Sequence, residues 1–571
     1  MKYQRLILFA IILLTLLFAW PWLFNLAGDA QVHLVVAEQL SQGSPFQYNP
    51  SGEIVNASTS PFWTLMLTLF FLLVGAYAPL LLKAIVVAIW AGTGYLFYRT
   101  ARDLWHFQDY ILLAAVGWWL TNTTIISNGL AGMENILAAL QLLLAYYWSV
   151  KWCGRLSYPK SLAMGLLLGW SILTRPEGGA FCASAIVFSF AAGRLFKENE
   201  RLGFAQWAKL LCSLVFTTLI VISPWYIYQY QMTGKLVSDS SIARLYAGRQ
   251  GSMAILDNIL YFHPKALVSL STAFLPATAG AVVLIIAYGG RILHSKEQWR
   301  DMILNEYPQA LALLISIIGF GFYSFVVGAE SFGRYFLPIF PFLLLSGVAG
   351  LHHLAKFVQR YRPLGSIIFI VATVFMLAVS GVDHYRRVAV GQYKSGPVLN
   401  VIYGPANLQY FSYNLRDIIK APQRRTQHTA ELRHALGETT NRPIRFAVTE
   451  VQLRYFVDES VSVLSLDGRT SAVILDYYNP GNGVPDFEGY FTATQPDFVH
   501  VAQWCSVGGW LARISETDIQ ENLVCEWKNR IDQMEMGESF EWNGRPVRYV
   551  APDIVQIIWP SEGETASPDQ D

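Results

Sequence analysis

The chain alternates long apolar runs with short polar segments over its first two thirds. Eleven runs have the composition of membrane-spanning helices, at residues 6–25, 78–98, 110–127, 132–150, 162–174, 179–193, 210–226, 267–289, 308–327, 335–353 and 364–382. A helix needs about 20 apolar residues to cross a bilayer, so 162–174 and 179–193 are expected to span only if their ends extend or the bilayer thins. The pattern predicts a polytopic α-helical membrane protein.

The apolar run at 62–74 is short for a span, and the distribution of positive charge decides its placement. Clusters of Lys and Arg occur near residues 99–102, 151–160, 194–201, 291–300 and 356–362. Cytoplasmic loops carry an excess of Lys and Arg, and all five clusters face the cytoplasm only if 62–74 does not span. We therefore expect an interfacial helix at 62–74, about 11 transmembrane helices, a cytoplasmic N-terminus and an extracytoplasmic C-terminus. Residues 6–24 are too long for a typical signal-peptide core, so we expect them to remain as the first helix.

The pattern changes near residue 383, where strand-length apolar runs replace helix-length ones. These runs lie at 444–448, 461–466, 472–478, 497–502 and 552–559, and residues 428–436 have the pattern of an amphipathic helix. Mixed strands and helices predict a small α/β domain at 384–560, followed by a disordered tail at 561–571. We also expect a Cys505–Cys525 disulfide, provided that this domain is extracytoplasmic.

Composition agrees with the pattern. Hydrophobic residues make up 53% of the chain and charged residues only 14%, whereas soluble proteins carry about 25% charged residues. The net charge of +1 suggests no nucleic-acid partner. The sequence contains no phosphate-binding Walker loop, dinucleotide fingerprint, HExxH zinc motif or nucleophile elbow.

The expected topology gathers carboxylates and arginines on the outward-facing side of the membrane. The outward segments hold Asp29, His33, Glu53, Glu134, Arg175, Glu177, Lys235, Arg244, Glu330 and Arg334. Ionisable groups beside an apolar phase are costly and tend to be functional. The candidate site is therefore expected at this surface.

Asp29 lies a few residues beyond the first apolar run, in the polar segment 26–61. It reads either as a general base or metal ligand, or as a helix N-cap, a position that Asp favours. A helix would place His33 on the same face, as a partner of Asp29 or as a packing residue. Glu134, in NGLAGMENILAAL, is explained either by the helix dipole or by a Gly-Met-Glu backbone that approaches a ligand.

The segment LTRPEGG at 173–179 is the strongest local signal. It joins two short apolar runs by a charged turn at the expected outer surface. Arginine is suited to hold a phosphate by two parallel hydrogen bonds, which makes Arg175 a candidate ligand. The alternative is a structural Arg175–Glu177 pair that closes the turn.

Two further outward segments carry weaker candidates. Arg334 begins an apolar run and either extends to the interface or meets an anionic lipid headgroup. Tyr335 beside it has the character of an interfacial aromatic residue. Lys235 and Arg244 lie in the long loop 227–266, which has the length to close over a substrate.

Five of these segments, in order, resemble motifs of the GT-C glycosyltransferases, which use sugars carried on polyprenyl phosphate. Members include protein mannosyltransferases, the lipid A aminoarabinose transferase and mycobacterial arabinofuranosyltransferases. The resemblance covers about residues 1–380 and rests on residues 28–67, NGLAGMENILAAL (128–140), LTRPEGG (173–179), MTGKLVSDSSIARLYAG (232–248) and FGRYFLPIFP (332–341).

The resemblance implies a GT-C-like domain at 1–383, with an outer loop and interfacial helix at 26–77. It implies that Asp29 is the general base; we further expect Arg175 and Arg334 to bind the donor phosphate, and the substrate to meet His33, Glu134, Glu177, Tyr335 and Lys235. Many members carry two adjacent acidic residues where this chain has Gly28-Asp29. Ser238-Asp239-Ser240 stands where arabinosyl-like members often have Pro-Asn-Thr.

We accordingly expect a glycosyltransferase of the bacterial inner membrane, with its C-terminal domain in the periplasm. It would move a sugar from a polyprenyl-phosphate-linked donor to a glycan, lipid or protein acceptor, with inversion. No cofactor is assigned, and a divalent metal ion is left open. One alternative is a flippase for lipid-linked glycans, which predicts mid-membrane charges or two related halves. The other is a membrane-anchored glycan-binding protein, whose isolated 384–571 fragment would bind ligand as well as the whole chain.

Overall fold

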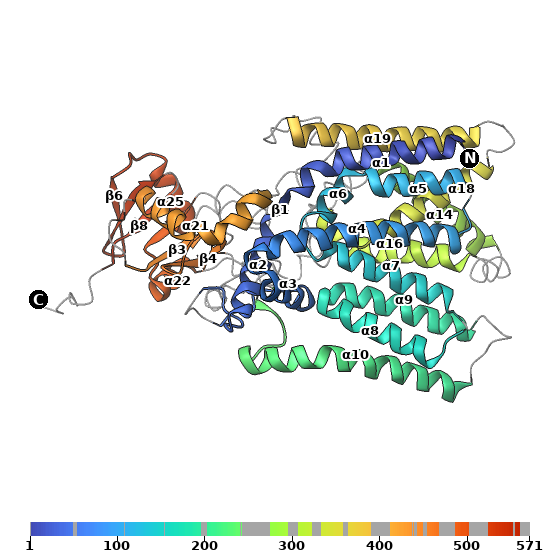
Figure 1. The fold of residues 1–571 in the computed structure, drawn as a ribbon, viewed down its shortest axis with the longest axis horizontal. Coiled ribbons are helices and arrows are strands. Elements are labelled where there is room, and N and C mark those ends of the chain that lie inside the picture. Colours follow the sequence, from blue (N-terminus) through green and yellow to red (C-terminus); the bar gives the residue numbers. More distant parts are fainter. Residues whose placement is uncertain are drawn as a thin grey trace, which may run out of the picture.

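A bundle of long helices leads into a smaller domain built on a β-sheet in the computed structural model (Figure 1). The structure describes residues 2–49, 54–107, 109–153, 155–195, 203–239, 241–242, 274–294, 306–322, 333–357, 364–389, 412–436, 438, 442–448, 454–466, 486–501, 523–551 and 554–559. Outside the described part lie Glu53, Arg244, Glu330, Cys505, the side chain of Arg334, the expected strand at 472–478 and the tail at 561–571.

Helices occupy the apolar part of the chain. They are α1 (Lys2–Leu23), α2 (Gly28–Ser41), α3 (Pro61–Val74), the 3₁₀ turn η1 (Gly75–Tyr77), α4 (Ala78–Asp103), α5 (Asp109–Thr121), α6 (Thr123–Gly129), α7 (Asn135–Lys151), α8 (Tyr158–Thr174), α9 (Pro176–Leu195), α10 (Phe204–Thr233), α14 (Leu275–His294), α16 (Tyr307–Gly321), α17 (Gly333–Phe336), α18 (Phe340–Phe357) and α19 (Leu364–Ala389). Most long helices run side by side along the long axis in Figure 1, with α1 and α19 on one flank and α10 on the other.

Proline and glycine set several helix ends. Prolines occupy the first turn of α3, α4, α8 and α16, where a missing amide proton breaks no helical hydrogen bond. Gly234 ends α10 with φ +68°, a left-handed conformation that favours glycine.

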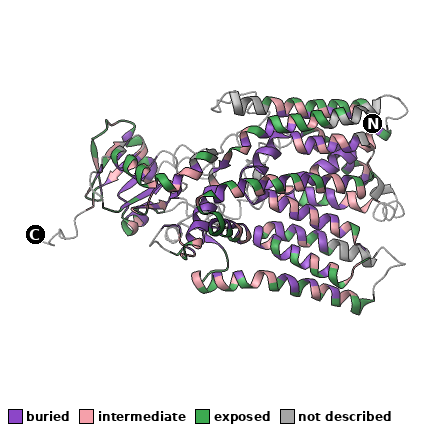
Figure 2. Cartoon of the chain, viewed as in Figure 1, coloured by how far each residue is buried: buried purple, intermediate pink, exposed green. Residues whose placement is uncertain are grey.

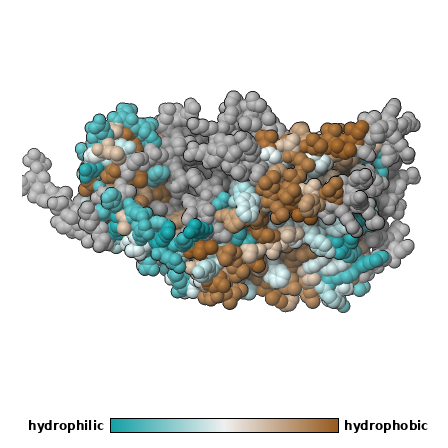
Figure 3. All heavy atoms as spheres, turned by 45° about the horizontal axis from the view of Figure 1, so that its top comes forward, coloured by the Kyte–Doolittle hydropathy of each residue, from teal (hydrophilic) through white to brown (hydrophobic). Residues whose placement is uncertain are grey.

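Many residues on the outer helices of the bundle are exposed (Figure 2), and apolar residues cover much of the described surface of the bundle on the face that Figure 3 shows. Leu13 on α1 is 58% exposed, Phe216 on α10 is 65% exposed and Val374 on α19 is 59% exposed. Soluble proteins rarely expose large continuous apolar surface, whereas lipid accepts it. The bundle therefore has the surface of a membrane protein.

Three helical stretches are long and apolar enough to cross a membrane: Pro61–Asp103, Phe204–Thr233 and Phe340–Phe357. Shorter apolar helices occur at Phe9–Leu23, Ile111–Thr121, Leu275–Gly290, Tyr307–Gly321 and Ile367–Val382. Each of the eleven expected runs contains a helix, and α8 and α9 extend beyond the short runs as the spanning hypothesis required. The run at 110–127 is divided, because Asn122 ends α5 and caps α6. The count of eleven spans remains a prediction.

The expected interfacial helix corresponds to α3, which runs in a different direction from α4 (Figure 1). Gly75 interrupts the helical stretch with φ +54°, and η1 leads into α4. In Figure 1, α3 lies with α2 at the end of the bundle and does not run alongside α4. The interfacial position of 62–74 stays a prediction.

The polar C-terminal part forms a mixed α/β domain, as its pattern predicts. Its helices and strands are β2 (Ser412–Asn414), α21 (Leu415–Ala435), β3 (Ile444–Val448), β4 (Val461–Ser465), α22 (Phe487–Thr494), β5 (Phe498–His500), α25 (Leu523–Ile531), β6 (Ser539–Trp542), β7 (Arg545–Ala551) and β8 (Ile554–Ile557). The sheet order is β4-β3-β5-β8-β7-β6, with parallel pairing among β4, β3 and β5 and antiparallel pairing beyond.

The strands expected at 444–448, 461–466, 497–502 and 552–559 are present as β3, β4, β5 and β8, and the helix expected at 428–436 is the end of α21. The hairpin β6–β7 was not predicted. Cys525 is disulfide-bonded, and its expected partner Cys505 lies outside the described residues.

Candidate active site

Asp29 lies in the first turn of α2, immediately after the short strand β1 (Asn25–Ala27). The N-cap of α2 is Ala27, so Asp29 is not the capping residue that one interpretation of the sequence expected. A carboxylate in the first turn is favoured by the positive end of the helix dipole. Asp29 is half-buried, so its side chain retains some access to solvent.

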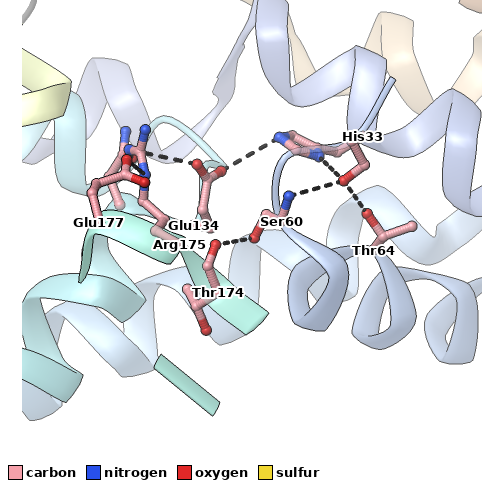
Figure 4. Close-up of polar contacts among 9 residues, drawn as sticks. His33, Ser60, Thr64, Glu134, Thr174, Arg175 and Glu177 are labelled. Atoms are coloured by element: carbon pink, nitrogen blue, oxygen red, sulfur yellow. Dashed lines mark hydrogen bonds and ion pairs between the residues drawn. The ribbon is translucent and has the colours of Figure 1, made fainter. Parts of the chain in front are cut away.

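His33 lies one turn further along α2 and points at Glu134 (Figure 4). Its Nε2 is 3.4 Å from Glu134 Oε2, and its Nδ1 is 3.4 Å from the Ser58 hydroxyl. The Ser58 hydroxyl is in turn 2.6 Å from that of Thr64 on α3. In the tautomer protonated at Nε2, His33 donates toward the carboxylate and accepts from Ser58. The ring is thus held between the first polar segment and the start of α7.

Glu134 occupies the N-cap position of α7 without a capping side-chain hydrogen bond. Gly132 before it has φ +86°, and a Cβ there would lie 2.3 Å from Leu26 Cδ2. The amide of Ala27 also donates to the carbonyl of Ala131 at 2.8 Å. The glycine therefore lets this loop pack against the start of α2, and a close approach of its backbone to a ligand stays a prediction.

Arg175 is the single residue between α8 and α9, and its backbone is extended. Its Nε donates to Glu177 Oε1 at 2.8 Å, and its Nη1 donates to Asn135 and lies 3.6 Å from Glu134 Oε1. Its guanidinium carbon is 5.1 Å from the centre of the Tyr335 ring on α17. Figure 4 shows the Glu134 carboxylate between Arg175 and His33.

The charge of this cluster is governed by burial and pairing. Glu134 precedes α7 and is 2% exposed. Burial raises its pKa, but the contact with His33 and the positive charge of Arg175 outweigh burial and lower the pKa from 4.5 to about 2. Glu134 is therefore ionised at neutral pH, and Arg175 stands between two carboxylates.

A second set of contacts joins the first polar segment to the LTRPEGG turn. The Ser60 hydroxyl donates to the carbonyl of Thr174 at 2.6 Å, and Gln141 Nε2 donates to the Thr174 hydroxyl at 3.0 Å. Gly179 lets α8 and α9 approach closely, because a Cβ there would lie 2.3 Å from Ile172 Cγ1. These contacts fix the backbone on either side of Arg175.

Lys235 meets the site through Asp239. Lys235 Nζ donates to Asp239 Oδ1 at 2.8 Å, and Asp239 Oδ2 accepts from the backbone amide of Asn56, also at 2.8 Å. Asp239 is 1% exposed. The segment after α10 is thus fastened to the first polar segment.

The structure brings together most of the residues that the sequence singled out. His33, Glu134, Arg175, Glu177 and Tyr335 form one connected cluster, and Asp29 lies one helical turn from His33. Arg334 begins α17 next to Tyr335, but its side chain is outside the described part.

Three residues were missed by sequence reasoning. Asn135 and Asp239 lie inside segments already singled out, but neither type of side chain reveals its partner from spacing. Lys83 is the sole charge in the run 78–98, a signal that could have identified it. It is 4% exposed, and its ammonium donates to the carbonyls of Asn25, at 2.6 Å, and Leu130.

Several buried polar atoms around the cluster lack an aligned hydrogen-bond partner within the described part of the chain. They are Glu134 Oε2, Asn135 Nδ2, Asn56 Nδ2 and Gln141 Oε1.

No group of three or more His, Cys, Asp or Glu side chains in the described ranges is placed to hold a metal ion.

Comparisons with known proteins concern the whole fold. No family model matches the sequence, and no curated protein matches it. ArnT from Cupriavidus metallidurans, bound to undecaprenyl phosphate, gives a TM-score of 0.48 with 15% identity, covering 87% of this chain and 92% of that chain. The Archaeoglobus fulgidus oligosaccharyltransferase in the apo form gives 0.45 with 11% identity, covering 89% and 71%.

A third structure is AglB from Archaeoglobus fulgidus, in complex with an inhibitory peptide and a dolichol-phosphate. Its TM-score is 0.43 with 12% identity, covering 87% of this chain and 69% of that chain.

Proposed function

We propose that this protein is a membrane glycosyltransferase that transfers a sugar from a polyprenyl-phosphate-linked donor to a cell-envelope acceptor. One observation carries the proposal: the segments that resemble GT-C motifs, far apart in the sequence, meet in one cluster of carboxylates, arginine and histidine. The cluster joins α2 to the start of α7 and the end of α8.

In the proposed reaction Asp29 is the general base. Its carboxylate takes the proton from the acceptor hydroxyl as the hydroxyl oxygen forms a bond to the anomeric carbon. The bond from that carbon to the donor phosphate oxygen breaks at the same time, and polyprenyl phosphate leaves with the electron pair. A single displacement inverts the anomeric centre. The phosphate leaves as an anion, so the site must stabilise negative charge more than it must supply a proton.

Arg175 and Arg334 are proposed to face the donor phosphate. Glu177 and Asn135 hold the Arg175 guanidinium in a fixed orientation, and Tyr335 lies against its face. Pre-oriented charge is the form of electrostatic stabilisation that needs least rearrangement during reaction. His33, Glu134, Glu177, Tyr335 and Lys235 are proposed to contact substrate or to order the groups that do.

The two alternative functions predict different behaviour. A flippase would move a labelled lipid-linked sugar across the membrane without forming a glycosyl product. A tail that binds glycans by itself would act as an isolated fragment, but Ile418, Ala421 and Tyr455 of the C-terminal part are buried in the same apolar cluster as the bundle. That packing favours one integrated protein.

The proposal is tested by Asp29→Asn, which keeps the size of the side chain and removes the base. Removing a positioned base typically lowers the rate by about 10²–10⁴-fold. Asp103→Asn, at the last residue of α4, is the matched control and should retain transfer. Full transfer activity in Asp29→Asn would exclude Asp29 as the base.

A further inference from the structure

The C-terminal domain contacts the segment that carries Asp29 at three separate points. From these contacts we infer that the domain is a positioning element for α2, and that Glu38, Asn49 and Arg425 are positioning residues for the transfer reaction. The inference rests on the proposed function for what α2 does, but the contacts themselves do not depend on it.

The first contact fixes the start of α2. Strand β1 pairs antiparallel with β2, with Ala27 opposite Ser412 and Asn25 opposite Asn414. Residue Gly28 follows β1 directly and begins α2. The backbone that leads into Asp29 is therefore held by β2, a strand that follows the last bundle helix in the sequence.

The second contact fixes the last turn of α2. Arg425 Nη1 and Nη2 donate to the two carboxylate oxygens of Glu38 at 3.1 and 2.5 Å. Arg425 Nε also donates to the carbonyl of Tyr455 at 3.1 Å, and its guanidinium carbon is 5.4 Å from the centre of that ring. Glu38 is 8% exposed, so this is a largely desolvated, bidentate pair whose geometry Lys would not reproduce.

The third contact holds the chain beyond α2. Asn49 Nδ2 donates to the carbonyl of Val463 at 3.0 Å, and the amide of Val463 donates to Asn49 Oδ1 at 2.9 Å. Val463 is in β4, which is at one end of the sheet order among the described residues. The Asn49 amide thus takes the place of a neighbouring strand's peptide group. Asn49 is 7% exposed.

The geometry of α2 gives these contacts their meaning. Asp29 and Glu38 are nine residues apart, which at about 3.6 residues per turn places them on opposite faces of the helix. The face with Asp29 and His33 meets Glu134, while the face with Glu38 meets the C-terminal domain. The domain therefore holds the strand that precedes α2 and the face of its last turn that points away from Asp29. These contacts set the distance of Asp29 and His33 from the rest of the site.

Four variants are compared in the test. They are Glu38→Gln, Arg425→Gln, the double variant that combines these two changes, and Arg425→Lys. Arg442→Gln, which breaks the Arg442–Asp497 pair inside the C-terminal domain, is the matched control. Hydrogen exchange of the α2 amides is measured without substrate, and kcat and donor KM are measured for transfer. Arg425→Lys keeps the charge and serves if Arg425→Gln fails to fold.

We expect exchange in α2 to rise and kcat to fall on the order of 10-fold in each single variant, with the double no worse than either. Donor KM should change little, because Arg175 and Arg334, which are proposed to face the donor phosphate, lie outside α2. Arg425→Lys should be intermediate, and Arg442→Gln should leave both α2 exchange and kcat unchanged. The inference would be overturned if the Glu38 and Arg425 variants left hydrogen exchange in α2 unaltered. It would also be overturned if they lowered kcat no more than Arg442→Gln does.

Failure of this inference and failure of the proposed function are distinguishable. Exchange in α2 reports positioning whether or not a sugar is transferred. An active Asp29→Asn variant with loosened α2 in Arg425→Gln would refute the base and keep the positioning contact. An inactive Asp29→Asn variant with unaltered α2 in Arg425→Gln would do the reverse.

Discussion

At the scale of residues, the site is a compact ionic cluster whose members neutralise one another. Arg175 is 5% exposed and contacts two carboxylates, Glu134 and Glu177. A buried charge that loses its partner is far more costly than an exposed one. The cluster should therefore respond sharply to removal of one member.

Arg175→Gln should destabilise the protein by about 3–5 kcal/mol, because it leaves the buried Glu134 without its cation. Arg102→Gln is the control, since Arg102 pairs with Asp103 at the surface with a side chain 49% exposed. An exposed pair contributes about 0–1 kcal/mol. Thermal unfolding of the detergent-solubilised variants measures both, and equal losses would contradict the buried cluster.

The same carboxylate predicts how stability depends on pH. The pKa of Glu134 is lowered from 4.5 to about 2, so its ionised form stabilises the folded state. That stabilisation is complete above pH 4.5 and is lost as the pH falls toward 2. Wild type should therefore lose thermal stability relative to Glu134→Gln on acidification below pH 4.5. A stability advantage of wild type over Glu134→Gln that grew on acidification would contradict this prediction.

At the scale of elements, glycines at two turns let the site assemble. Gly132 allows the loop before α7 to lie against α2, and Gly179 allows α9 to lie against α8. Each brings a charged residue, Glu134 or Arg175, to the cluster from a different helix. The helix ends can approach this closely because neither position has a Cβ.

Gly132→Ala should be strongly destabilising, since its φ of +86° alone costs about 1–3 kcal/mol for a residue with a Cβ. Contact of the new methyl group with Leu26 adds to this cost. Gly92→Ala on α4 is the control, because no atom lies within 4 Å of a Cβ there. It should be neutral or stabilising, as alanine favours helix. Similar unfolding temperatures for the two variants would contradict the close packing at Gly132.

The sequence predicted elements better than it predicted contacts. Residues 29 and 33 could be placed on one helix face, because helical spacing is local. The contact of Glu134 with Arg175 could not, since it depends on how separate helices pack. The hairpin β6–β7 had a usable signal in Asn543-Gly544, whose φ values are +48° and +70°. The pairing of β1 with β2 had no signal in the sequence, because a strand of three residues is too short to show an alternation of apolar and polar positions.

At the scale of the whole molecule, the account requires one orientation in the membrane. The C-terminal domain and α2, which carries His33 of the cluster, lie toward one end of the bundle in Figure 1, and the start of α8 lies toward the other. Charge distribution in the sequence predicts that the first end faces outward. This sidedness is not contained in the fold and needs its own test.

Single cysteines at Gln42 and Tyr158 test the orientation, since both positions are exposed. Cys212 is exposed and should first be changed to Ser, whereas Cys153 and Cys182 are buried. An impermeant maleimide should label Gln42→Cys in intact spheroplasts and Tyr158→Cys only after permeabilisation. Labelling of both from the same side would refute the topology.

Transfer of a sugar from a polyprenyl-phosphate-linked donor is measured most directly as release of polyprenyl phosphate by the purified protein. The full chain is incubated in detergent with a lipid extract containing polyprenyl-phosphate sugars and with an acceptor fraction, and free polyprenyl phosphate is followed by mass spectrometry. The account predicts time-dependent release, matched by a glycosylated acceptor and lost in Asp29→Asn. Transport of the lipid-linked sugar in vesicles without any release of polyprenyl phosphate would contradict it.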